Sequence, residues 1–341
     1  MNGLLPASIL PGLLETALKS RVNVQSLFES AGIDADIVGR QDRFISLEQL
    51  DTLLSTAFGM AEDPWFGLSV GRENHYGNLD LLGNLMATSD TLGDAMELLL
   101  RYKDLLVPYL QFDLDVVDDR ARITSTSDES LNFTRTRTHN EVVVATMVSI
   151  GRSLLGGEMG LRRVLLRHQW PPDPEPYREF FGVPVECGRP CNGVEFDRDR
   201  LDVPLPTAFP KYNQRLRRLA EQQLAELNRA RGVVGQVLAM LSERLGRDEI
   251  GIAAIAAQLH VTPRTLQRRL RREGTTYASL RDRVRHERAC RRLSGERCDM
   301  EELARALGFS DTANFYHAFR RWEGCAPGAY RRRIREQASG A

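Results

Sequence analysis

Four side chains suited to recognising DNA bases lie close together in the C-terminal third of the sequence. They are Arg264, Gln267, Arg268 and Arg271. In an α-helix, residues at i, i+3, i+4 and i+7 share one face. Arginine fits the guanine edge in the major groove of DNA and glutamine fits the adenine edge, while the flanking Arg269 and Arg272 are suited to phosphates. The pattern indicates a DNA-recognition helix; the alternative is an arginine-rich face that only meets solvent.

The residues around this stripe predict how the helix is positioned. Thr262 followed by Pro263 is typical of a helix N-cap and first turn. Leu266 and Leu270 are four residues apart and predict a buried face opposite the stripe. A short helix before the turn carries Ala256, whose small side chain lets two helices cross closely. Together these signals predict a helix-turn-helix.

The same pattern occurs a second time. The first copy spans residues 252–274 and the second spans 300–324. Ala256 corresponds to Ala304, an offset of 48 residues, and the second helix of the pattern is offset by 49. Two tandem copies argue against an incidental arginine-rich surface helix. They indicate a domain with two helix-turn-helix units.

The net charge of zero hides an uneven distribution. From Gly235 to Ala341 there are 21 Arg and 13 Asp or Glu, which gives +8, so the remaining residues carry −8. A basic C-terminal third on an acidic body is typical of a nucleic-acid-binding module attached to another domain. Charge alone would leave a solvated arginine-rich face equally acceptable.

The segment from about residue 233 to 333 resembles the AraC/XylS family of transcription regulators. The residues that carry the resemblance are Leu303-Ala304, Leu307-Gly308-Phe309, Phe315, Phe319-Arg320-Arg321-Trp322, Gly324, Pro327 and Tyr330-Arg331. The resemblance implies two helix-turn-helix units joined by a long helix, here Ser279 to Leu293. It also implies that the two recognition helices enter successive major grooves, which lie about 34 Å apart.

The resemblance further implies which residues contact DNA. In the first unit they are Arg264, Gln267 and Arg268, with Arg271 on the same stripe. In the second unit they are Thr312, Ala313, Asn314 and His317, followed by Arg320. His317 departs from the family, where this position is often Arg, and a neutral His cannot make the bidentate guanine contact of Arg. The first unit is therefore expected to carry most of the base specificity.

The N-terminal two thirds predict a mixture of helices and strands. Helical periodicity or capping signals occur at Val24 to Ala31, Ser46 to Met60, Leu92 to Leu106 and Asn140 to Leu155. Alternating apolar residues at Tyr109 to Val117 and Ala121 to Thr126, separated by Asp118-Asp119, predict a β-hairpin, and further short strands are expected at Arg162 to His168 and Gly193 to Phe196. The expected fold is an α+β N-terminal domain followed by an all-α DNA-binding domain.

These signals divide the chain into four parts. They are an effector-binding or dimerisation domain at residues 1–208, a helical linker at 209–232, the DNA-binding domain at 233–333, and a tail at 334–341. Lys211 to Arg231 is a polar helix whose inner side is expected to hold Leu216, Leu219, Leu224 and Leu227. This helix is equally compatible with being the last helix of the N-terminal domain.

The N-terminal domain resembles that of regulators of the ornithine-utilisation and mycobacterial virulence-regulator type. The matching segments are Asp63 to Leu68, Tyr177 to Pro184 and Pro204 to Pro206. The resemblance implies a domain that binds a small-molecule effector or mediates dimerisation, and it leaves the effector unidentified.

Motifs of enzymes and cofactor sites are missing from the sequence. There is no Walker or GxGxxG loop, no GxSxG and no HExxH. The five cysteines have no zinc-like spacing, so reduced thiols, no metal and no cofactor are expected. His139 and His75 could line a pocket, but a structural or solvated role is favoured for each. An effector-independent dimeric regulator and a bifunctional enzyme with a DNA-binding tail remain as alternatives.

Location and partners follow from these inferences. The most apolar stretch, Val142 to Leu155, is interrupted by polar residues, and Met1 to Leu18 lacks the basic start of a signal peptide. No membrane span is expected, and the protein is expected to be cytoplasmic. The expected partners are double-stranded promoter DNA, RNA polymerase, an unidentified small-molecule effector and a second copy of the chain. Activation is expected because the family mostly recruits polymerase.

Overall fold

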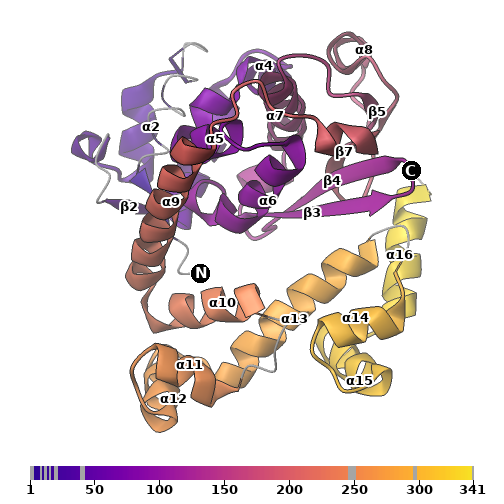
Figure 1. Cartoon of the computed structure of the whole chain (residues 1–341). Coiled ribbons are helices and arrows are strands. Elements are labelled where there is room, and N and C mark those ends of the chain that lie inside the picture. Colours follow the sequence, from indigo (N-terminus) through magenta and orange to yellow (C-terminus); the bar gives the residue numbers. More distant parts are fainter. Residues whose placement is uncertain are drawn as a thin grey trace. The chain divides into compact units, whose positions relative to one another are not determined.

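The computed structural model describes most of the chain. The described residues are 4–7, 10, 14, 17–18, 22–38, 43–244, 251–294 and 298–339. They form two compact units, Met1–Leu227 and Asn228–Ala341, which Figure 1 colours from indigo to red and from orange to yellow. The first unit combines sheets with helices, and the described part of the second is helical. The predicted fold class is confirmed, while the predicted domain boundaries stay a prediction.

A five-stranded sheet organises the first unit. Its strand order is β3 (Leu110–Val117), β4 (Arg120–Ser127), β7 (Asn192–Asp197), β5 (Leu161–Leu165) and β6 (Val185–Glu186). Neighbouring strands are antiparallel except β5 and β6. The predicted hairpin is confirmed as β3 and β4, with Asp118 in its turn at φ 55°. A separate two-stranded sheet pairs β1 (Leu4–Pro6) with β2 (Phe44–Ser46).

Helices pack around the sheet of the first unit (Figure 1). They are α2 (Val24–Ala31), α3 (Leu47–Met60), α4 (Phe66–Glu73), α5 (Asp80–Ala87), α6 (Leu92–Tyr102), α7 (Arg137–Leu155), α8 (Glu175–Phe181) and α9 (Pro210–Ala230). Helix α3 begins with a capping box, because Ser46 and Gln49 each bond the other's backbone N–H. Helices α4, α5 and α8 were not predicted. They are short and none begins with a side-chain cap, whereas α2, equally short, is capped by Asn23.

Helix α9 contributes to the core of the first unit. Leu216 and Leu227 are buried in that core and Leu224 packs against it. The Asn213 side-chain amide donates to the Leu85 carbonyl oxygen at 2.8 Å, which fixes the start of the helix against α5. The prediction that Leu219 lies on the inner side is wrong, because this side chain is 43% exposed. The stripe Leu216, Ala220, Leu227 is buried instead, as the period of 3.6 residues requires.

Two glycines allow α4 and α7 to pack unusually closely. A Cβ on Gly71 would lie 2.5 Å from the Cβ of Ala145 and 2.9 Å from the carbonyl oxygen of Val142. Gly67, one turn earlier, faces the backbone of Thr138 in the same way. No larger residue fits at such distances without moving a backbone. The two helices therefore contact each other backbone to backbone.

The second unit has seven helices among its described residues. They are α10 (Gly232–Arg244), α11 (Ile252–Gln258), α12 (Pro263–Arg272), α13 (Tyr277–Ser294), α14 (Met300–Ala306), α15 (Thr312–Glu323) and α16 (Pro327–Ser339). Figure 1 shows the pairs α11–α12 and α14–α15 on either side of α13, which confirms the predicted long connecting helix. One apolar core joins all of these pairs, with Val284 of α13 among its buried members. Nowhere among the described residues is there a helix long and apolar enough to cross a membrane.

The α4–α7 contact gives a testable prediction for stability. We expect Gly71→Ala to lower the free energy of unfolding of the first unit by about 1–2 kcal/mol, because the overpacking cost exceeds the helix propensity gained. The control is Gly59→Ala on α3, where a Cβ meets nothing within 4 Å and a gain of about 0.5–1 kcal/mol is expected. Urea denaturation followed by circular dichroism measures both. Equal effects of the two substitutions would contradict the close packing.

Candidate functional site

In the first helix-turn-helix, α11 and α12 cross at a small, buried residue. Ala256 of α11 is fully buried against α12, where Leu266 and Leu270 are also fully buried. Thr262 caps α12 as predicted, because its hydroxyl accepts the N–H of Thr265 at 3.2 Å. These contacts fix the rotation of α12 about its own axis. They therefore decide which of its side chains face outward.

The outward face of α12 is the predicted arginine and glutamine stripe. All four of its members, Arg264, Gln267, Arg268 and Arg271, are exposed. The structure records no hydrogen bond or ion pair between any of these four side chains and another described residue. The helix carries five arginines and no acidic residue, so its outward face is strongly positive. Contacts with guanine edges and phosphates require guanidinium groups that have no other partner and are held on a rigid helix.

The second helix-turn-helix repeats the architecture with larger side chains. Phe315 and Phe319 of α15 are fully buried, and Ala304 of α14 is 2% exposed at the crossing. Asp311 caps α15, with Oδ1 accepting the N–H of Asn314 at 2.7 Å. The turn before α15 holds Gly308 in the left-handed region at φ 70°. The first copy places a histidine, at residue 260, in the same conformation at φ 53°.

The outward face of α15 differs from that of α12. Asn314, His317 and Arg320 are exposed and Thr312 is half-buried. The Asn314 side-chain amide donates to Oδ2 of Asp311 at 2.8 Å and to Oγ of Ser310 at 3.0 Å. Its two N–H donors are thus engaged within the cap. Compared with α12, this helix has fewer free donors to offer to base edges.

Helix α13 holds the second helix-turn-helix through charged side chains. Arg285 of α13 donates to the carbonyl oxygen of Leu307 at 2.9 Å and to that of Gly308 at 2.6 Å, and its guanidinium lies 4.4 Å from the ring centre of Phe309. Arg321 of α15 forms an ion pair with Asp282 of α13 at 2.6 Å. The turn between α14 and α15 and the later part of α15 are therefore both attached to the connecting helix.

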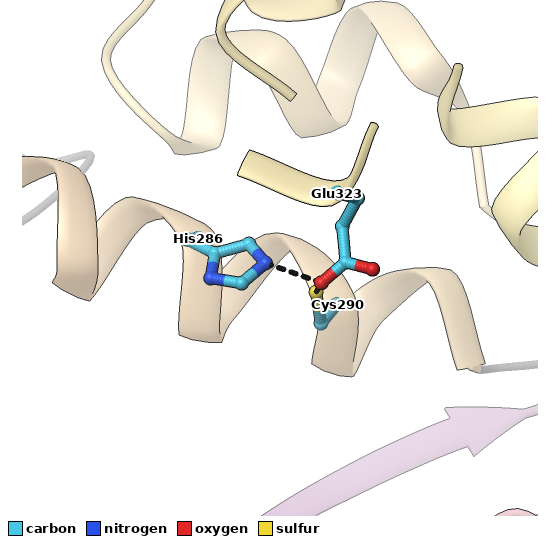
Figure 2. Close-up of side chains that lie close together, drawn as sticks. All are labelled: His286, Cys290 and Glu323. Carbon is cyan, nitrogen blue, oxygen red and sulfur yellow. Dashed lines mark hydrogen bonds and ion pairs between the residues drawn. The ribbon is translucent and has the colours of Figure 1, made fainter. Parts of the chain in front are cut away.

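A further cluster joins α13 to the end of α15. Figure 2 shows His286 and Cys290, one turn apart on α13, facing Glu323. His286 Nε2 lies 2.8 Å from Glu323 Oε1, and the Cys290 thiol donates to the same oxygen at 3.8 Å. Among the described residues, this group has the spacing to hold a metal ion. Burial raises the pKa of Cys290 to about 12, and Arg333 also reaches Glu323, at 3.4 Å. In this arrangement the thiol is protonated and the carboxylate already pairs with the Arg333 guanidinium.

Sequence reasoning did not identify this cluster. The i, i+4 spacing of His286 and Cys290 was available as a signal, but the third member comes from another helix. The expectation of no metal rested on the cysteine spacing, the missing HExxH motif and the scatter of the histidines along the sequence.

The first unit contains a cavity of about 260 Å³ between its two apolar cores. Its walls come from the N-terminal helices, the sheet and α7, and they include Leu50, Phe66 and Leu154. His139 of α7 lines this cavity and is only 2% exposed. His75 is not among the lining residues; it caps a short turn through a bond from Gly77 N–H to its Nδ1. The sequence could not distinguish these two histidines.

Comparison with known proteins agrees with this architecture. Residues 22–205 match the family described as the arabinose-binding domain of AraC transcription regulators, at their N-terminus. Residues 255–333 match a helix-turn-helix domain family. The chain belongs to the AraC family of transcription regulators. It is thus a DNA-binding transcription regulator, with an N-terminal domain of the arabinose-binding type and a helix-turn-helix C-terminal domain.

Several relatives align over almost the whole chain. The ornithine utilization regulator of Pseudomonas aeruginosa is 29% identical over 96% of both chains. The HTH-type transcriptional regulator VirS of Mycobacterium tuberculosis is 27% identical over 88% of both. The crystal structure of the transcriptional regulator CdpR from Pseudomonas aeruginosa is 27% identical, covers 90% of this chain and 96% of that one, and superposes with a TM-score of 0.46. The resemblance predicted from the sequence is confirmed.

The contacts of Arg285 give a prediction for this AraC-family domain. Arg285→Ala should destabilise the α14–α15 unit by about 2 kcal/mol, because two carbonyl oxygens lose a charged donor. Amide hydrogen exchange measured by mass spectrometry should accelerate in residues 300–323 and much less in residues 252–272. The control is Arg283→Ala on the same helix, which bonds the exposed Glu287 and should change stability by less than about 0.5 kcal/mol. Uniform acceleration across the domain would contradict a local role.

Proposed function

We propose that this chain is a transcription activator that recognises its promoter mainly through α12. The observation that supports this most strongly is the contrast between the two recognition helices. Helix α12 presents four exposed donors without partners among the described residues, whereas Asn314 of α15 uses its amide in its own cap. His317 stands where α12 has Arg268, so the second unit lacks a guanine fork at this position. Thr312, Asn314, His317 and Arg320 then contribute phosphate and secondary base contacts.

In this role the protein binds double-stranded promoter DNA in the bacterial cytoplasm and recruits RNA polymerase. The first unit binds a small-molecule effector, and the cavity between its two apolar cores supports this role. Domain boundaries near residues 208, 232 and 333 separate effector binding from DNA recognition. The two compact units, Met1–Leu227 and Asn228–Ala341, each have their own apolar core, which supports a division near residue 232. Helix α9, within the proposed linker, packs on the core of the first unit.

We also propose that the chain acts as a homodimer that associates through α9. Three large apolar side chains on or next to this helix are substantially exposed: Phe209 at 56%, Tyr212 at 43% and Leu219 at 43%. Tyr212 and Leu219 are seven residues apart and therefore lie on the same helix face. Exposed apolar side chains gathered on one helix face are typical of protein–protein contacts. Dimerisation would link two DNA-binding domains and raise their joint affinity by effective concentration.

Arg268→Ala tests base recognition by α12. We expect it to weaken binding to a preferred site by about 1–3 kcal/mol while binding to scrambled DNA changes little. The preferred site is obtained by in vitro selection from random DNA with the full chain, and affinities are measured by fluorescence anisotropy at one fixed salt concentration. Arg305→Ala is the control, since Arg305 is exposed on α14 and pairs with Glu301 at 3.1 Å. Equal losses on both DNAs would assign Arg268 to a phosphate contact.

Leu219→Glu tests the proposed dimer. A charge on the exposed face of α9 should shift the full chain toward the monomer in sedimentation, and should weaken binding to DNA that carries two selected sites by at least about tenfold. Gln214→Glu adds the same charge at an exposed position of the same helix that lies on a different face from Leu219, and it should leave both properties unchanged. A wild-type monomer at micromolar concentration, with and without DNA, would refute the dimer.

A further inference from the structure

The cavity of the first unit has almost entirely apolar walls. Its lining is made of leucine, methionine, valine, isoleucine, alanine and phenylalanine side chains, together with a few polar residues: Asn74, Asn78, Tyr109, His139 and Thr146. A water molecule occupies about 30 Å³ of liquid, so a volume of about 260 Å³ accommodates a molecule of roughly ten non-hydrogen atoms. A ligand in such surroundings gains affinity by burying apolar surface.

Three of the polar residues are already engaged in hydrogen bonds within the protein. The Asn74 side-chain amide donates to the Thr146 hydroxyl at 2.8 Å. The side-chain carbonyl of Asn78 accepts the backbone N–H of His75 at 2.9 Å. These bonds leave few donors and acceptors to satisfy a ligand with many polar groups. Burying an unsatisfied hydroxyl or amine is unfavourable.

His139 is the exception, because it lines the cavity with its polar atoms unsatisfied. The side chain is 2% exposed, and neither ring nitrogen has a hydrogen-bond partner among the described residues. The Thr134 carbonyl lies near enough to favour the protonated ring slightly, yet not in hydrogen-bond geometry. Burial, and to a smaller extent the positive charge of Arg167, lower the pKa of His139 to about 4. At neutral pH the ring is therefore uncharged and offers one donor and one acceptor.

The charge of Arg167 also indicates which head group is favoured at His139. Its positive potential, partly balanced by the Glu129 carboxylate that pairs with Arg167, disfavours a cation beside the His139 ring. A carboxylate or hydroxyl oxygen fits this potential and can accept the imidazole N–H. An ammonium group fits neither, and a sugar carries more hydroxyls than the walls can satisfy.

We propose that the first unit binds an apolar molecule of roughly ten non-hydrogen atoms that carries one oxygen head group, and that this head group hydrogen-bonds to His139. This inference rests on the proposed function, because it takes the ligand to be the effector. The apolar part of the ligand lies between the α2–α3 core and the core around the sheet, in contact with both. Neither a sugar nor a polar amino acid has this chemistry.

Matched small molecules test the ligand class. Octanoic acid, 1-octanol, octylamine and arabinose are similar in size and differ in polarity and charge. Calorimetric titration of the full-length protein at pH 7 should give saturable binding of octanoic acid or 1-octanol, and none of octylamine or arabinose at millimolar concentration. The same titration with ornithine should be negative. Binding of arabinose or ornithine, equal binding of octylamine, or no binding of either oxygen compound would overturn the proposal.

Two substitutions test the position of the ligand. His139→Phe should weaken binding of the oxygen compound at least tenfold without lowering the melting temperature of the ligand-free protein, since no protein partner loses a hydrogen bond. A purely structural histidine would show the opposite result. Val142→Phe, one turn further along α7 and lining the same cavity, should block binding by occupying space. Val116→Phe on the exposed part of β3 is the control and should bind as the wild type does.

Binding of selected DNA is measured on the same preparations. A protein that binds its DNA but none of the oxygen compounds refutes the ligand class and leaves the DNA-binding proposal standing. A protein that binds an oxygen compound but shows no sequence preference on DNA refutes the proposed recognition and leaves the ligand class intact. Wild-type affinity of His139→Phe for the oxygen compound would remove His139 from the site.

Discussion

DNA recognition in this protein depends on the burial of two pairs of apolar side chains, each spaced four residues apart. Leu266 and Leu270 fix the rotation of α12, and Phe315 and Phe319 fix that of α15. A helix turned by a single residue would rotate by about 100° and would move its outward stripe away from a groove. The need to bury these pairs also explains the alanine where the two helices of each unit cross. The small side chain of Ala256 leaves room for Leu266 and Leu270 to reach the core. Packing therefore decides which side chains each helix presents outward, before any contact with DNA is made.

The two helix-turn-helix units share this framework but differ in how they are held. The second is attached to α13 by Arg285 and by the ion pair of Arg321 with Asp282, in addition to its apolar core. Its recognition helix uses part of its polar side chains for capping and attachment. The first leaves its stripe unengaged. This difference follows from side-chain chemistry. Asp311 at the N-cap of α15 and Asn314 three residues later bond each other before they can bond DNA.

Much of the second unit could be predicted from the sequence. Local signals determine its helices: the Thr262 cap, the apolar pairs and the repeat itself each involve residues within one turn or two. The contacts of Arg285 and the cluster of His286 with Glu323 could not be predicted, because they join helices that are far apart in the sequence. In the first unit, the strand pair β3–β4 was predictable because its turn is local. The short helices and the parallel pairing of β5 with β6 depend on tertiary packing, which the sequence pattern does not reveal.

The candidate cavity could not be predicted from the sequence at all. Its walls come from segments between residues 14 and 159, so no single stretch of sequence marks it. A lone histidine in an apolar helix most often has a structural role, and sequence reasoning favoured that role for His139. Aromatic neighbours, Tyr109 and Phe133, enclose its ring. Only the arrangement in space distinguishes it from His168, whose Nε2 lies 2.8 Å from the Tyr177 hydroxyl.

The backbone contact between α4 and α7 has a mechanical consequence. Gly71 brings the two helices so close that neither can slide or tilt without pushing on the other's main chain, because packed interiors yield little to local strain. The pair therefore behaves as one rigid body. His139 lies on α7 and Phe66 on α4, and both line the cavity. A ligand that displaces one of these two helices therefore also displaces the other, and the movement reaches both ends of α7.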